Sequence, residues 1–326
     1  MRILNQPWVK VMCAVVGVAA YGSISSAADQ RSYAGVGISV ESDGIAACAA
    51  RTVSGGDVVA DVVTGSAMAY GQFRDKHIAN SKTKDIVVGL DMGSLTPWLG
   101  WINQSFSGKV SYKNGSVTTY DSQLSQVSKL SWQQGVISGI EFPELDAASK
   151  AGGEVKLTIS PQRATRSGTG GKVATAASAK QQRFSASNFR ITIDGVDLTR
   201  VARIQPLSVR TKVATNSVGI GRELEKVAGV AEVSNLVLFA DSHDSASLQS
   251  WYESFVVRGE ASQEKEKSGR IELLAPDMKT VLLSIGLHGV GIVTLGSESE
   301  TSVNKDSLPR LRAELYVEYI TVDPPK

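Results

Sequence analysis

The chain has 326 residues, and at roughly 150 residues per domain this length favours two domains over one. With 42% hydrophobic and 20% charged residues, the composition is that of a folded protein and excludes disorder over most of the chain. The net charge of +2 is too small to indicate a nucleic-acid-binding surface, which requires clustered Lys and Arg.

Residues 1–28 have the pattern of a signal peptide. Arg2 and Lys10 precede the apolar run Val11–Ala20, and Ser26–Ala28 supplies the small residues that a signal peptidase needs. We therefore expect cleavage near Ala28 and export to the periplasm, the outer surface or the medium; without cleavage the protein would be cytoplasmic or part of a virion. The alternative is a buried first strand or helix. The run is too short to span a membrane comfortably, so we expect no transmembrane segment in the mature chain.

Cys48 would be the only cysteine of that mature chain, so no internal disulfide can form. The residue lies between two pairs of alanines, and these neighbours predict that its side chain is a small, buried hydrophobic group. An exported protein without disulfides must be stabilised by its cores or by assembly.

A short amphipathic helix is predicted in the first half of the chain. Thr96 suits the N-cap and Pro97 the first helical position. Leu99, Ile102 and Phe106 then recur on one face, with Trp101 beside them.

A turn and a long strand are predicted after this helix. Tyr112–Gly115 contains Asn-Gly and predicts a hairpin turn that leads into a strand at Ser116–Tyr120. Further on, apolar and polar residues alternate, which predicts a strand with one dry face, and this strand could be bent. The residues on its dry face are Leu130, Trp132, Val136, Ile140 and Phe142.

Residues 161–185 are predicted to form a flexible basic linker. The segment is rich in Ser, Thr, Gly and Ala, contains Lys and Arg but no acidic residue, and cannot build a core. It would divide the mature chain into a first domain at 29–160 and a second domain at 186–326.

The second half repeats the features of the first half. Asp194-Gly195 predicts a hairpin turn between strands at Phe189–Ile193 and Val201–Leu207. A helix is predicted after the capping residues Asp244 and Ser245. Its apolar face consists of Leu248, Trp251, Phe255 and Val256.

Two further elements complete the second half. Lys267–Gly269 predicts a turn that leads into a strand at Arg270–Leu274. A final half-buried strand is predicted by alternation, with Leu311, Ala313, Leu315, Val317 and Tyr319 on its inner face. The shared order of helix, turn and closing strands in both halves predicts an internal duplication. We expect a mainly β protein with two tandem β-barrel or sandwich domains, each with one short flanking helix.

Segments of both halves resemble the tail tube family of contractile phages, commonly labelled "phage tail protein". The resemblance covers nearly all of the mature chain, and its most specific segment is Phe142–Lys150. The other segments that carry it are Lys76–Asn80, Asp85–Gly93, Trp98–Phe106, Tyr112–Val117, Ser187–Phe189 and Lys265–Gly269.

This resemblance implies that each domain is a tail-tube-like β-barrel with a side helix, and that the chain is a structural, self-assembling subunit of a phage tail-like or injection-related tube. Its partners would be itself, in a ring, and further copies stacked on that ring. Two fused modules imply a trimer with pseudo-sixfold symmetry. The predicted signal peptide departs from the family, because phage tubes assemble in the cytoplasm. The alternative is a monomeric periplasmic or extracellular binding module on the same fold.

The sequence offers little for catalysis. The only histidines are His77, His243 and His288, and none has a metal-ligand partner at a suitable spacing. Asp241–Ser245 places an acid, a base and a hydroxyl side by side, but catalytic triads are assembled from distant segments, so a loop that caps a helix is the better interpretation.

The remaining candidate motifs also give no evidence of a catalytic or binding site. Gly168–Val173 and Gly219–Gly221 lack the residues of a phosphate-binding loop, and Glu141, Glu144 and Asp146 are expected to be solvated surface carboxylates. We therefore predict no catalytic, cofactor-binding or metal-binding residue, no cofactor and no enzymatic activity.

Overall fold

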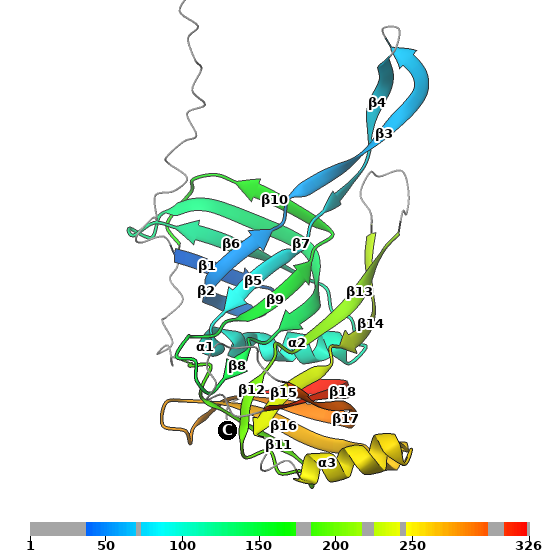
Figure 1. The fold of residues 1–326 in the computed structure, drawn as a ribbon. Coiled ribbons are helices and arrows are strands. Elements are labelled where there is room, and N and C mark those ends of the chain that lie inside the picture. Colours follow the sequence, from blue (N-terminus) through cyan, green and yellow to red (C-terminus); the bar gives the residue numbers. More distant parts are fainter. Residues whose placement is uncertain are drawn as a thin grey trace, which may run out of the picture. The chain divides into compact units, whose positions relative to one another are not determined.

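The computed structural model describes residues 37–69, 73–173, 184–216, 225–241, 246–298 and 310–324 (Figure 1). These residues fold mainly into strands with a few short helices, which confirms the predicted mainly β class. Within them the strands form a nine-stranded sheet, a seven-stranded sheet and a separate two-stranded hairpin. The predicted signal peptide at 1–28 lies outside the described residues.

The first sheet contains a closed barrel. Its strands are β1 (Gly37–Ser42), β2 (Ile45–Gly55), β5 (Ile86–Leu90), β6 (Lys113–Tyr120), β7 (Gln126–Glu141) and β9 (Val155–Ser160). Antiparallel pairing follows the order β7-β6-β1-β2-β5-β9, and β9 pairs again with β7. β7 can pair with β6 along its first part and with β9 along its second part because it bends at Gln134, whose φ of 48° lies in the left-handed region.

The predicted apolar positions of β7 are correct, since Leu130, Trp132, Val136 and Ile140 are all buried. The prediction of a single dry face is wrong beyond Gln134, because every residue of β7 from Gly135 to Ile140 is buried. The Trp132 indole lies against two glycines, because a Cβ at either Gly115 or Gly135 would come closer to the ring than van der Waals contact allows. Its Nε1 donates a hydrogen bond to the Lys113 carbonyl at 3.2 Å. The glycines therefore make room for the largest side chain of the barrel.

A helical segment lies between β5 and β6. It consists of α1 (Met92–Leu95), a 3-10 turn (Thr96–Trp98) and α2 (Leu99–Phe106). The prediction that Thr96 is the N-cap is wrong, because the helical backbone already begins after Asp91 and Thr96 has αR dihedrals. The predicted apolar face is otherwise correct, since Leu99 and Ile102 are buried.

Cys48 is buried, as predicted, and its Sγ accepts a hydrogen bond from Nε1 of Trp98 at 3.2 Å. Burial raises the pKa of the Cys48 thiol above its ordinary value, and the hydrogen bond from Trp98 only partly offsets this effect. The thiol is therefore a packing group and not a reactive one.

Two predicted turns are wrong. Asn114 and Gly115 lie inside β6, and Lys267–Gly269 begins β16 (Lys267–Leu274). In both strands glycine is needed because the neighbouring strand lies close to it, and not because of a positive φ. A Cβ at Gly269, for example, would meet a backbone carbonyl of the neighbouring strand at 2.5 Å.

The second sheet is open. Its remaining strands are β8 (Leu145–Asp146), β11 (Phe189–Ile193), β12 (Val201–Ile204), β15 (Leu236–Asp241), β17 (Val281–Glu298) and β18 (Arg310–Asp323). Their order is β11-β16-β17-β18-β15-β12-β8. Asp194-Gly195 is a turn, as predicted, with a φ of 70° at the glycine. The predicted hairpin is nevertheless wrong, because β11 pairs with β16 and β12 pairs with β15.

The second helix, α3 (Ala246–Tyr252), continues into a π-helical turn at Glu253–Val257. Leu248, Trp251 and Phe255 are buried, as predicted, whereas Val256 is 38% exposed. The wider π turn changes the helical period after Tyr252, so Val256 leaves the apolar face. The predicted caps at positions 244 and 245 lie outside the described residues.

The final strand confirms the alternation up to Val317 and then departs from it. Ala313, Leu315 and Val317 are buried, but Tyr319 is 54% exposed. Ile320 is buried instead, because β18 there contacts α2, and the Asn103 amide donates a hydrogen bond to the Val322 carbonyl at 2.7 Å.

The two sheets share their order of pairing along the chain. Five strand pairs of the barrel have counterparts in the second sheet. β1–β6 corresponds to β11–β16, β6–β7 to β16–β17, and β7–β9 to β17–β18. β2–β5 corresponds to β12–β15, and β5–β9 to β15–β18. The β1–β2 pair has no full counterpart in the described residues, where only an isolated bridge between Ile193 and Val196 takes its place. The second sheet is therefore arranged like the barrel but is open between β11 and β12.

The interruptions in strand register fall at corresponding positions. The register shifts at Lys113/Gly115 in β6 and at Lys267/Gly269 in β16. It shifts at Ile137/Gly139 in β7 and at Ile292/Thr294 in β17. It also shifts at Ala50/Thr52 in β2 and at Val201/Arg203 in β12. Bulges are specific local features, so their agreement aligns the two sheets residue by residue.

Each half of the chain also contains a long hairpin at the same place in its order of strands. The first arm is the hairpin of β3 (Val58–Ala69) and β4 (Phe73–Thr83), which lies between β2 and β5 in the chain. The second arm is the hairpin of β13 (Ser208–Asn216) and β14 (Glu225–Val233), which lies between β12 and β15.

Strand pairing crosses the predicted domain boundary. β10 (Arg163–Ser167) pairs with β7 inside the range predicted as a flexible linker, because it continues β9 along the same neighbour. The second arm joins the first sheet, β8 joins the second sheet, and residues 35–326 group as one compact unit. Positions 174–183 of the linker lie outside the described residues, and the division into two domains stays a prediction.

Candidate functional site

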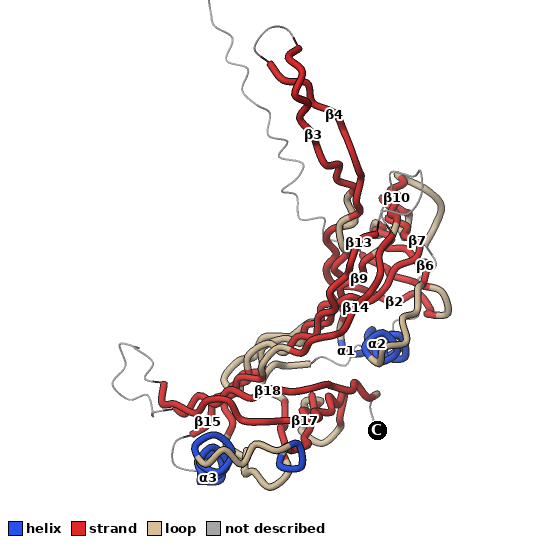
Figure 2. Tube along the Cα trace, turned by 90° about the vertical axis from the view of Figure 1, so that its right-hand side faces the viewer, coloured by secondary structure: helices blue, strands red, loops and turns tan. Residues whose placement is uncertain are grey.

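The first arm exposes apolar side chains along both of its strands. Val58 is 58% exposed, Val62 61% and Phe73 72%, and Val63 and Ile78 are also exposed. Within the described residues β3 pairs only with β4, so its outer backbone edge is open. Figure 2 shows the arm as a two-stranded ribbon that extends beyond the other strands. An exposed apolar edge of this length is a surface for another strand.

The base of the first arm is held by a network of polar contacts. Arg166 of β10 donates to the Gly55 carbonyl at 2.9 Å and pairs with the Asp57 carboxylate at 3.1 Å. Lys226 of the second arm donates to the Thr83 carbonyl at 2.8 Å and to Asp85 at 3.0 Å. The point at which the arm leaves the barrel is therefore fixed on both strands.

The base of the second arm, in contrast, is paired with the barrel. Residues Ser208–Arg210 of β13 pair with Gly139–Glu141 of β7 in an antiparallel ladder. Val209 and its partner Ile140 are each only 2% exposed. At the edge of this contact Glu141 lies 3.0 Å from Lys156 and 3.7 Å from Arg210.

β17 carries an open edge at the position where β7 receives β13. β16 pairs with β17 only as far as Val290, whereas β18 pairs with it as far as Glu298. Beyond Val290, one edge of β17 has no partner among the described residues. Val293 and Thr294 are exposed there, and Leu295 is partly buried.

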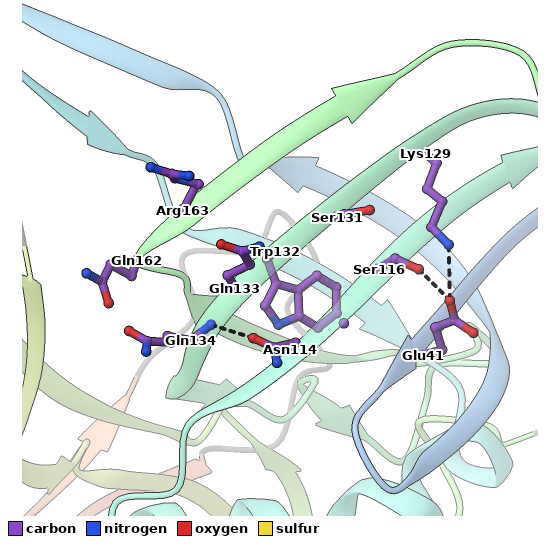
Figure 3. A pocket seen from close by; sticks show the side chains of 11 residues that line it. Glu41, Asn114, Ser116, Lys129, Ser131, Trp132, Gln133, Gln134, Gln162 and Arg163 are labelled. Atoms are coloured by element: carbon purple, nitrogen blue, oxygen red, sulfur yellow. Dashed lines mark hydrogen bonds and ion pairs between the residues drawn. The ribbon is translucent and has the colours of Figure 1, made fainter. Parts of the chain in front are cut away.

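A polar pocket of about 700 Å³ lies on the barrel, with Trp132 among its lining residues (Figure 3). Its charged side chains already have partners, because Glu41 accepts a hydrogen bond from Ser116 at 2.6 Å and lies 3.4 Å from Lys129. The lining residues include no histidine and no cysteine. The pocket offers hydrogen-bonding groups.

A second pocket of about 940 Å³ is more apolar. Phe106 of α2, Val230 of β14 and Tyr319 of β18 are among the residues that line it. Val230 is 83% exposed, and the Tyr319 ring stacks on His288 with 4.5 Å between the ring centres. This surface can take an apolar or aromatic group.

The described residues contain no group of three or more His, Cys, Asp or Glu side chains placed to hold a metal ion. His77 lies on the exposed first arm and His288 on β17, while position 243 lies outside the described residues. The predicted absence of catalytic, cofactor and metal sites stays a prediction. In the described part of the chain no helix has the length and apolar character needed to cross a membrane.

The carboxylates Glu141, Glu144 and Asp146 are not gathered into one site. Glu141 pairs with Lys156, Glu144 lies 3.8 Å from Arg203, and Asp146 accepts a hydrogen bond from the Ala148 amide. Of the two glycine-rich segments, Gly168–Val173 runs beside the start of β7, where the Gln126 amide donates to the Gly171 carbonyl. Gly219–Gly221 lies outside the described residues.

The sequence analysis missed the first arm. Val58-Val59 and Val62-Val63 form two apolar pairs around the polar Asp61, so the segment shows no clean alternation of period two. The available signal was the run of valines in a segment with no helical period.

No family model matches the chain, and no curated protein matches it. Among solved structures, a chain of the anti-feeding prophage baseplate is 16% identical with a TM-score of 0.35, covering 47% of this chain and 98% of its own length. A chain of the PVC sheath-tube complex, an extracellular contractile injection system in its extended state, is 15% identical with a TM-score of 0.34, covering 46% and 99%. A chain of the anti-feeding prophage tube-terminating cap is 14% identical with a TM-score of 0.33, covering 47% and 95%.

Proposed function

We propose that this protein is a structural subunit that associates with further copies of itself into a ring or tube of a phage tail-like or injection-related assembly. The observation that carries the proposal is the first arm, with its open backbone edge and its exposed valines. The sequence resemblance to tail tube proteins supports the same role.

The energetics of the first arm favour a partner. An isolated two-stranded hairpin is at best marginally stable in water, because each strand lacks a second neighbour. Burying exposed apolar side chains such as Val62 and Phe73 would contribute roughly 1.5–3 kcal/mol for each side chain that becomes fully covered. Self-association provides this burial without a second gene product.

The proposal extends to symmetry. The matching strand orders and bulges support an internal duplication into two tail-tube-like units, and the contact between β13 and β7 is of the heterologous kind, in which different surfaces meet. Heterologous contacts close into rings when the rotation allows it. Three copies with two units each would form a ring with pseudo-sixfold symmetry, and stacked rings would form a tube.

One observation favours the alternative, a monomeric periplasmic or extracellular binding module. The apolar pocket beside Tyr319 and Val230 could receive a ligand without any assembly. The two functions differ in one measurable property, because a binding module stays monomeric at high concentration.

Sedimentation velocity over a wide concentration range, with negative-stain electron microscopy of the same samples, tests the proposed function. We expect a species of three chains, rings in projection and stacked rings at the highest concentration. A strictly monomeric protein without rings at every concentration would overturn the proposed function and favour the binding module.

We also propose that the assembly forms outside the cytoplasm, on the basis of the signal-peptide pattern at 1–28. Mass analysis of the protein from separate cell fractions tests this. An N-terminus at Asp29 in an exported fraction is the expected result, and an intact Met1 in the cytoplasm alone would contradict export.

A further inference from the structure

We propose that the first arm of one copy pairs with the open edge of β17 in a neighbouring copy, in the same register in which the second arm pairs with β7 within the chain. The pairs would be Asp57 with Gly296, Val58 with Leu295 and Val59 with Thr294. This inference rests on the proposed self-association and names the surfaces that carry it.

The two arms correspond residue by residue. Pairing in the first arm shifts register between Ala60 and Val62, and pairing in the second arm shifts between Thr211 and Val213, which lie 151 positions further on. A backbone hydrogen bond at the base of each arm also matches, from Lys84 to Asp57 at 2.9 Å and from Ser234 to Ser208 at 2.8 Å. Val58 therefore corresponds to Val209.

The two receiving strands correspond equally closely. The bulges at Ile137/Gly139 and Ile292/Thr294 align β7 with β17 at a separation of 155 positions. Ile140, the partner of Val209, therefore corresponds to Leu295. On this alignment β13 lies against the part of β7 that corresponds to the open edge of β17.

Burial differs between the corresponding pairs. Val209 and Ile140 are almost fully buried against each other, whereas Val58 is 58% exposed and Leu295 only partly buried. Among the described residues, a donor strand and an acceptor edge with the same local geometry are therefore both left open. β3 belongs to the first of the two repeated halves of the chain and β17 to the second. A neighbouring copy can therefore supply the missing partner to each of them.

The open surfaces also fit each other chemically. A Cβ at Gly296 would meet nothing within 4 Å, so the face of the sheet at this residue has room for a side chain of an approaching strand. In the chain's own contact the Phe142 amide donates to the Leu207 carbonyl at 2.8 Å, and the corresponding groups between copies are the Ser297 amide and the Gly56 carbonyl. The ion pair of Arg210 with Glu141 has no counterpart, so this contact would depend on backbone hydrogen bonds and on the two aliphatic side chains.

Cysteine cross-linking tests the register. Directly opposed residues of antiparallel strands have Cβ atoms about 4.5–5.5 Å apart, close enough for a disulfide after small adjustments. We expect a V58C/L295C variant of the full chain to form disulfide-linked multimers, and an equimolar mixture of V58C and L295C to form linked dimers. V62C mixed with L295C is the matched control, because Val62 would lie about 13 Å further along the strand.

The outcomes separate this inference from the proposed function. Rings that form without a V58C–L295C link, or that link V62C equally well, would overturn the proposed register and leave self-assembly standing. Monomers in every sample would overturn both. V209C/I140C is the positive control for the chemistry, since its disulfide would form within one chain at any concentration.

Both substituted positions lie on the surface or near it, and circular dichroism of each variant checks the fold. Cys48 is buried with a raised pKa, and the single variants measure any background from the native cysteines. A V58S/L295S variant provides a second readout that needs no cysteine. Its association constant should fall at least tenfold, and an unchanged constant would contradict the proposed contact.

Discussion

The two arms of this protein have matching registers but different surroundings. β13 of the second arm lies between β14 and β7 and buries Val209, while β3 of the first arm pairs only with β4 among the described residues and exposes Val58. Local sequence does not account for this difference, because Val58 and Val209 hold matching positions and both strands carry the same bulge. The difference arises because the chain contains a receiving strand for one arm within reach, and we propose that another copy supplies the other.

The largest expected effect is on folding. Val209→Asp places a carboxylate where 2% of the side chain is exposed, without a partner for the charge. We expect a loss of about 3 kcal/mol or more in the free energy of unfolding, measured by urea denaturation. A loss below about 0.5 kcal/mol would show that the contact between β13 and β7 does not form in solution.

The corresponding change in the first arm should act on assembly. Val58→Asp leaves the free energy of unfolding of the monomer within about 0.5 kcal/mol of the original value, because the side chain is exposed. It should abolish rings, because each contact would otherwise bury an unpaired carboxylate against Leu295. Urea denaturation checks the stability and sedimentation velocity checks the loss of rings, with Val257→Asp, another exposed valine, as the control. Rings of V58D at the original concentration would contradict the equivalence of the arms.

The glycines at the matched bulges sharpen the comparison of the two sheets. Gly115 and Gly269 each face a backbone carbonyl of the neighbouring strand, and neither has room for a methyl group. Gly115→Ala and Gly269→Ala should each lower the free energy of unfolding by about 1–3 kcal/mol. Gly100→Ala is the control, since this helical position has nothing within 4 Å of a Cβ and should be neutral or slightly stabilising. Unequal effects at 115 and 269 would weaken the structural match.

A smaller effect is expected at the contact between α2 and β18. The Asn103 amide donates to the Val322 carbonyl at 2.7 Å, and its oxygen accepts from the Val322 amide at 3.0 Å. Asn103→Ala should cost about 1–2 kcal/mol, because both backbone groups lose their partner. Calorimetry of the variant beside Gln104→Ala, an adjacent change without these bonds, measures the difference.

The smallest effect concerns the turn between β16 and β17. The Asp277 carboxylate accepts a hydrogen bond from the Thr280 hydroxyl at 2.6 Å and others from the Lys279 and Thr280 amides, and these bonds lower its pKa to about 2. The stabilisation is present above the ordinary pKa of 3.8 and is lost as the pH falls through about 2. As the pH is lowered from 5 to 2, the midpoint temperature of unfolding should therefore fall less steeply in D277N than in the original protein. Parallel curves would contradict this role of Asp277.

The sequence predicted the elements whose pattern is local. Leu130 and Trp132 alternate with less buried residues in the first part of β7, and Trp251 marks α3 because a helical period surrounds it. The pattern failed at Val256 because a π turn changes the period.

Features that depend on distant segments were not predictable. Gly115 and Gly269 had the signature of turns, but both are needed as strand residues beside a carbonyl that arrives from elsewhere in the chain. The first arm was missed for a related reason, since an exposed edge without its partner imposes no alternation on the sequence. The surface proposed for assembly is therefore the part that local patterns describe least well.

Hydrogen–deuterium exchange across a dilution series tests the central claim most directly. The account predicts that the amides of Ser208–Arg210 that face β7 are protected at every concentration, because this partner strand is in the same chain. In the monomer, the amides of residues 57–59 that do not face β4, and those of Thr294–Gly296 that do not face β18, should exchange quickly. They should become protected together as rings form. Assembled rings in which both of these segments still exchange as in the monomer would contradict the account.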